Sequence, residues 1–211
     1  DGKQGVLWAA DNDLNPTLGN TADKGPGSIN KFVYQNGAWQ QDPTDGWTFT
    51  NNGQTKGGKQ LHFKDGTGGV DSEGITLING DSSKGVFIGA ERDNENKNVP
   101  RPSILQYDVT EKTTDANGDG AHDLNATHEW NLTAALTQFG VTLGHGADAN
   151  LGVEGIAFIP NSVLTANGFQ SNLDPKNVVT YNPDGFGNDF GGLFLPHRRK
   201  PVISTPSRCK P

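Results

Sequence analysis

Sulfur is almost missing from this 211-residue sequence, in which Cys209 is the single cysteine and methionine does not occur. A single cysteine excludes an intrachain disulfide, and one cysteine near a terminus carries little information about compartment. Long apolar runs are also missing, since none approaches the roughly 18 residues of a membrane helix. The sequence shows no signal-peptide pattern and opens on Asp1 rather than Met, so we expect a processed or excised product.

Basic residues are scarce as well, with 17 Lys and Arg against 24 Asp and Glu, a net charge of −7 and a pI near 5.1. No basic stripe is present, which excludes a nucleic-acid partner and electrostatic attachment to an anionic membrane. An acidic protein that binds an anionic substrate needs a bridging cation. The G-x-S-x-G, P-loop and H-E-x-x-H motifs are missing, and the five histidines show no metal-ligand spacing.

What the sequence does contain is 29 glycines, 12 prolines and 32% hydrophobic residues, with the apolar ones gathered into short runs. This composition predicts a folded all-β protein with long loops rather than a disordered chain.

One of these runs returns later in the chain. Val70–Asn79 (VDSEGITLIN) matches Leu151–Pro160 (LGVEGIAFIP) 81 residues later, which aligns Glu73 with Glu154. Three further pairs follow at spacings of 75 to 83 residues: Gly5–Asp13 with Gly85–Asp93, Ser28–Val33 with Ser103–Asp108, and Trp47–Thr50 with Trp130–Thr133. A repeat in constant order decides the architecture before any local assignment.

Each repeated piece has the pattern of a β-strand, with β-branched and aromatic residues bounded by Gly, Asn and Asp. The strand after Ser103 alternates, with Leu105, Tyr107 and Val109 on one face. Four-stranded units repeated along a chain are typical of β-propeller blades. We therefore predict an all-β fold of β-propeller blades, each of four antiparallel strands.

The blade pieces fall at about 1–50, 70–133 and 151–195, within a propeller portion of 1–195. Residues 51–69 form a linker with a short strand near 60–63, a short helix follows residue 134, and 161–189 is an insertion. The basic, Pro-rich tail 196–211 lies outside the repeat. Nine predicted strands cannot close a ring of about 4–8 blades, so we expect a partial propeller completed by further blades or other chains.

A possible calcium loop lies at 115–123 (DANGDGAHD), where Asp115, Asn117 and Asp119 alternate before a glycine turn and Asp123 follows. Alternate oxygen ligands around such a turn suit a cation that takes six to eight oxygens. The pattern departs from a calcium loop at its last position, where Ala126 replaces the usual glutamate. The alternative is a polar, turn-rich loop between two strands.

Acidic residues at equal places in successive blades form a second candidate site. Glu73 and Glu154 would converge on the central channel together with Asp71, and converging carboxylates repel unless a cation or proton intervenes. Alternatively, each glutamate only accepts backbone N–H bonds at a blade corner. Glu91 and Arg92 end the next strand, where Arg92 would grip an anion or else belong to a solvated charge cluster.

Three stretches resemble the bacterial phytase-like family known as "esterase-like activity of phytase": DSEGITLI, GAERDNENKNVPRPSILQYDVT, and ATHEWNLT with GADANLGVEGIAFIPNSVL. The resemblance implies a secreted or periplasmic propeller, six-bladed when complete, with calcium-dependent ester or phosphoester hydrolysis. It also implies that Glu73, Glu91 and Glu154 belong to the channel site. The family would continue past 191–194 into further blades, whereas this chain turns into LPHRRKPVIS.

Two functions follow as hypotheses. The first is a calcium-assisted phosphoester or ester hydrolase of the phytase-like type, acting on a small anionic or ester substrate, with Glu73, Glu154, Glu91 and Arg92 as its catalytic residues. The second is a non-catalytic, calcium-stabilised propeller that binds a ligand or a protein. Fold alone does not decide between them.

Overall fold

The computed structural model describes residues 5–12, 25–51, 53–146, 149, 152–174, 177–185 and 190–198. These residues contain fifteen strands and short helices, of which α1 (Thr133–Gln138) and α2 (Asn161–Ala166) have six residues each. The all-β prediction is confirmed. None of the helices in the described ranges has the length and apolar character needed to cross a membrane.

The predicted four-strand segment 70–133 forms one antiparallel sheet in chain order. Its strands are β7 (Val70–Thr76), β8 (Val86–Asp93), β9 (Pro100–Tyr107) and β11 (His128–Asn131). Two short 3-10 turns, η1 (Ile78–Gly80) and η2 (Ser82–Lys84), join β7 to β8. Ile88 faces both Ile75 and Leu105, so three β-branched or aliphatic side chains align across the sheet.

Burial in this sheet follows the predicted alternation. Leu105 and Tyr107 are fully buried and Val109 nearly so, whereas Asp108 on the opposite face is exposed. The central strand β8 is buried on both faces from Val86 through Glu91. The predicted core is therefore present at these positions.

The first sheet differs in part from the prediction. It contains β1 (Val6–Asp11), β2 (Ser28–Gln35), β6 (Lys59–His62) and β10 (Asp123–Asn125) in that order, with β3 (Ala38–Gln41) also paired to β2. The predicted strand at Trp47–Thr50, the third of this unit, does not join it. That segment instead forms a separate hairpin of β4 (Thr48–Asn51) with β5 (Gln54–Gly57).

A glycine turn explains this change of partner. Gly58 has φ +107, and a Cβ atom there would lie 2.9 Å from the Oγ of Ser28. The glycine thus lets the chain pass close to β2 before Lys59 pairs with Ile29. The short strand predicted near 60–63 is confirmed as β6, and Trp47 packs edge-on against Trp8 in the core instead of extending the sheet.

The third unit pairs β12 (Val153–Pro160) with β15 (Gly192–Arg198). The strand β15 continues through Arg198, so the predicted tail boundary at 196 is wrong by three residues, and the rest of the tail lies outside the described residues. The predicted insertion 161–189 contains α2, the hairpin β13 (Gln170–Asp174) and β14 (Asn177–Thr180), and η4 (Pro183–Gly185). The prediction of nine strands was too low because it missed such short hairpins.

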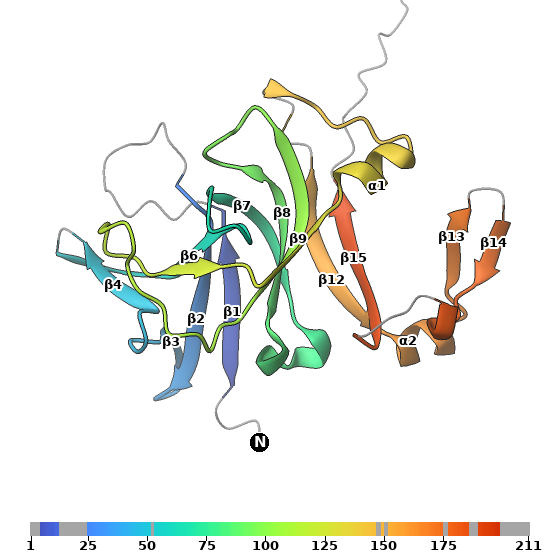
Figure 1. The fold of residues 1–211 in the computed structure, drawn as a ribbon. Coiled ribbons are helices and arrows are strands. Elements are labelled where there is room, and N and C mark those ends of the chain that lie inside the picture. Colours follow the sequence, from blue (N-terminus) through green and yellow to red (C-terminus); the bar gives the residue numbers. More distant parts are fainter. Residues whose placement is uncertain are drawn as a thin grey trace, which may run out of the picture.

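Figure 1 shows the three units side by side in sequence order, with β7 and β8 between β1 and β12. The Oγ of Ser72 donates to the carbonyl of Asp11 at 2.6 Å, which ties β7 to β1. The backbone N–H of Phe158 donates to Thr76 Oγ1 at 3.1 Å, which ties β12 to β7. β7 and β12, the strands that carry Glu73 and Glu154, are each held in this way against the unit that precedes them.

Candidate functional site

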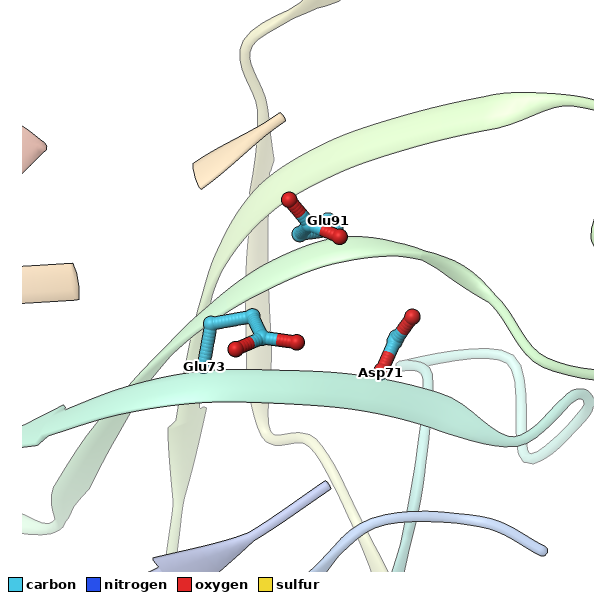
Figure 2. Close-up of side chains that lie close together, drawn as sticks. All are labelled: Asp71, Glu73 and Glu91. Carbon is cyan, nitrogen blue, oxygen red and sulfur yellow. The ribbon is translucent and has the colours of Figure 1, made fainter. Parts of the chain in front are cut away.

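Three carboxylates meet between β7 and β8, as Figure 2 shows. Asp71 and Glu73 alternate along β7 and so project from the same face, while Glu91 projects from β8. One oxygen from each lies within 4.8 Å of the other two. Asp71 and Glu91 are fully buried, and Glu73 is half-buried.

Two irregularities in strand pairing surround this cluster. The β7–β8 register shifts between Val70 and Ser72 and again between Ser72 and Gly74. Such bulges redirect side chains, and here one falls at Asp71 and the other at Glu73. Neighbouring strands thus aim like charges at one another, which a protein avoids unless something compensates the charge.

A fourth carboxylate reaches the cluster from β12. Glu154 lies close enough to Glu91 to share a hydrogen bond when one of the two is protonated. The backbone N–H of Gly152 donates to Glu91 Oε1 at 3.1 Å. The repeated Glu-Gly pair explains the approach, because a Cβ atom on Gly74 would lie only 2.7 Å from the Cα of Gly155.

Burial and charge raise the pKa of Glu91 to about 8, from an ordinary value of 4.5. The loss of hydration is the main cause, and the charges of Glu154, Glu73 and Asp71 add to it. A proton or a cation is therefore strongly favoured at this position at neutral pH.

Among the described residues, and with the carboxylates ionised, three oxygens of the cluster are buried without a hydrogen-bond partner: Asp71 Oδ1, Glu91 Oε2 and Glu154 Oε1. A buried unpaired oxygen is rare because it loses the hydrogen bonds that water would give it. Three such oxygens in one place match the needs of a hard divalent cation, which prefers carboxylate ligands. The donor set therefore fits a bound calcium ion.

Arg92 does not belong to a solvated loop. Its Nε donates to Asp71 Oδ2 at 2.9 Å, and its side chain is only 11% exposed. The guanidinium therefore compensates one charge of the cluster and holds the Asp71 carboxylate in place. Its neighbour Asp93 accepts the backbone N–H groups of Gly69 and Glu95 and has a structural role.

The predicted calcium loop lies elsewhere, near β6 and β10. The Asp115 carboxylate accepts the N–H groups of Gly118, Asp119 and Gly120, and the side-chain oxygen of Asn117 also accepts the N–H of Asp119. A tight polar turn of this kind needs no ion to satisfy its oxygens.

The other two loop carboxylates bind β6. Asp119 Oδ2 accepts the side-chain amide of Gln60, and Asp123 Oδ1 lies 2.8 Å from His62 Nε2. In the described part of the chain, three metal-binding groups come within 4.8 Å of one another only in the cluster of Asp71, Glu73 and Glu91. Calcium at the loop stays a prediction.

The structure thus brings together the four carboxylates that the sequence pattern predicted. The pattern did not predict Gly152 as a donor, although the repeat spacing aligns Gly152 with Asp71. The repeat aligns Asn12 with Arg92 and so predicts it near the same site, and its side-chain amide lies 3.4 Å from Glu73 Oε1.

No family model, no curated protein and no solved structure matches this chain.

Proposed function

We propose that Asp71, Glu73, Glu91 and Glu154 hold a calcium ion, and that the protein is a calcium-assisted hydrolase of phosphoesters or esters. The observation that carries this proposal is the convergence of four carboxylates from three strands, with three buried oxygens that, when ionised, have no hydrogen-bond partner among the described residues. Mutual repulsion in this cluster is relieved most directly by a multivalent cation.

When bound, calcium would neutralise an anionic substrate and favour ionisation of a water molecule. The protein's own residues do the remaining work. Arg92 holds Asp71 in one orientation, and the N–H of Gly152 fixes one oxygen of Glu91. A cation held here would displace the proton of Glu91, so cation binding and proton release would be linked.

The proposed architecture is a partial β-propeller of the phytase-like type, secreted or periplasmic. Its support is the repeat, the four-stranded antiparallel sheet at β7–β11 and the placement of β12 beside β7. The proposed substrate is a small anionic or ester compound.

The alternative function is a non-catalytic, calcium-stabilised binding module. Deep burial favours it, since Asp71 and Glu91 expose no surface to a substrate in the described structure. In that case calcium would stabilise the packing of β7, β8 and β12 and would take no part in chemistry.

Calorimetric titration with calcium at pH 8, followed by a hydrolysis screen, separates these functions. We expect the unmodified protein to bind calcium and to hydrolyse p-nitrophenyl phosphate or acetate in calcium but not in chelator. Glu154→Gln should lose both properties. The exposed Glu95→Gln is the matched control and should keep both. Binding without hydrolysis would favour the module, and no calcium binding in the unmodified protein would overturn both functions.

A further inference from the structure

Two strands that occupy the same place in the repeat are covered very differently. β1 aligns with β8 at a spacing of 80 residues, so Val6 matches Val86 and Leu7 matches Phe87. Val86 and Phe87 are fully buried, whereas Val6 and Leu7 are 43% and 45% exposed. A strand of similar apolar sequence is therefore open to solvent in the first unit.

The difference comes from what lies beside each strand. β8 is paired with β7 on one edge and β9 on the other. β1 is paired with β2, and among the described residues no strand occupies its second edge. An exposed apolar edge strand is a ready template for another strand.

β7, in the neighbouring unit, lies where it would contact a strand added to the free edge of β1 in the described structure. Gly152, directly before β12, donates its backbone N–H to the Glu91 side chain on β8, and Ser72 on β7 donates its hydroxyl to the Asp11 carbonyl on β1. The repeat aligns Asp11 with Glu91 and places Ser72 one residue past the match of Gly152. β7 therefore relates to β1 as β12 relates to β8.

In the second unit, β7 pairs with β8 and packs against β12, so β7 fills the space between these two strands. The matching space in the first unit, between β1 and β7, is an open groove of about 340 Å³. Its lining includes Leu7 and Trp8 from β1 and Ile75 and Leu77 from β7. The groove is mostly apolar, and no strand in the described part of the chain pairs with the edge of β1 that borders it.

We propose that β1 accepts an extended segment donated by another polypeptide, which pairs antiparallel with β1 and fills this groove. The pairing of β7 with β8 sets the register, so the donated residue that matches Ile75 would face Trp8 and the one that matches Thr76 would face Leu7. The donated segment would have the sequence pattern of Val70–Asn79, with a glycine where its backbone must approach β7 closely. Backbone pairing supplies affinity, and the apolar groove selects the side chains.

A labelled peptide of sequence VDSEGITLIN tests this directly by fluorescence anisotropy with the intact protein. We expect saturable binding that is lost when the peptide's first isoleucine is replaced by proline or when its sequence is scrambled. Leu7→Lys, which places a charge on the edge, should weaken binding at least tenfold. Val163→Lys is the control, because Val163 is 47% exposed on α2, away from the groove.

Hydrogen exchange on the unmodified protein gives a second reading that does not depend on the variants. Saturating peptide should slow exchange of the amides of β1 and leave those of β13 unchanged. No binding, binding that Leu7→Lys leaves intact, or unchanged exchange in β1 would each overturn the proposal. Slower exchange in β1 at higher protein concentration without peptide would show that a second copy covers this edge, which also contradicts it.

Discussion

The backbone N–H of Gly152 donates to the carboxylate of Glu91 across 61 residues of sequence, at 3.1 Å. This bond places the start of β12 against β8 and brings Glu154 to the carboxylate cluster. Gly152 is suited to the contact because a Cβ atom there would lie 3.1 Å from the Glu91 backbone. The same contact therefore packs the third unit against β8 and completes the candidate site.

The close approach of β7 and β12 makes Gly74 the most informative position for stability. A Cβ atom on Gly74 would lie 2.7 Å from Gly155 Cα, against backbone that cannot rotate away. We expect Gly74→Ala to lower the free energy of unfolding by about 1–3 kcal/mol, the usual cost of overpacking. Urea denaturation followed by tryptophan fluorescence measures this.

Gly185→Ala is the matched control for that change, since no atom of the described residues lies within 4 Å of the place that the added methyl group would take. We expect its unfolding free energy to stay within about 0.5 kcal/mol of the unmodified protein. Equal effects of the two substitutions would contradict the packing of β12 on β7.

Glu91 gives the protein a stability that falls with rising pH in the absence of divalent cations. Its pKa is about 8 in the folded state against 4.5 ordinarily, so between these values the unfolded chain binds fewer protons than the folded chain. The free energy of unfolding must then decrease as the pH rises. Glu91→Gln removes this dependence because glutamine stays neutral.

In chelator at pH 8, we expect Glu91→Gln to be more stable than the unmodified protein by on the order of a few kcal/mol. The difference should shrink toward pH 5, where Glu91 is protonated in the folded protein. Urea denaturation at pH 5, 6.5 and 8 measures it, with Glu95→Gln as the control. Parallel pH curves for Glu91→Gln and the unmodified protein would show that Glu91 ionises freely.

Local pattern predicted the strands of this fold better than their partners. Trp47–Thr50 has a valid strand pattern and does form β4, but Gly58 lets the chain turn so that β6 takes the place beside β2. Partner choice depends on contacts far apart in sequence, which a local pattern does not contain. The candidate site was easier to predict, because the repeat aligned Glu73 with Glu154 and so identified two of its strands at once. Buried unpaired oxygens and the Gly152 bond arise only from packing.

Two regions compete as calcium sites, and single substitutions separate them. Calcium that binds only the folded state stabilises it by about 2.7 kcal/mol at a hundredfold excess over Kd. We expect Glu73→Gln to abolish this gain. Asp115→Asn should keep it, because the Asp115 carboxylate is occupied by three backbone N–H bonds.

Thermal melts in millimolar calcium and in chelator measure both variants. Asp115→Asn should lower the melting temperature equally in the two conditions, since it weakens a turn. A calcium shift lost in Asp115→Asn and kept in Glu73→Gln would move the ion to the loop at 115–123.

His62 supplies the last test, because both of its ring nitrogens face acceptors. Nε2 lies 2.8 Å from Asp123 Oδ1 and Nδ1 lies 2.7 Å from the carbonyl of Gly68. Only the doubly protonated ring can donate to both. The bond to Asp123 raises the pKa of His62 above 6.5, and the Gly68 carbonyl adds to this although burial opposes it. In Asp123, burial opposes ionisation, but the bond from His62 lowers its pKa overall.

A raised histidine pKa stabilises the folded protein fully below pH 6.5, and this contribution is lost as the pH rises through the folded-state value. The lowered pKa of Asp123 also stabilises the folded protein, and this contribution is lost as the pH falls below about 3.8. We expect His62→Gln to cost about 1–3 kcal/mol at pH 5.5 and less at pH 9. Because Glu91 changes stability in the same direction, urea denaturation should compare the variants in a Glu91→Gln background. A cost of His62→Gln that is the same at both pH values would show that His62 is neutral in the folded protein and that Asp123 holds it through a single hydrogen bond.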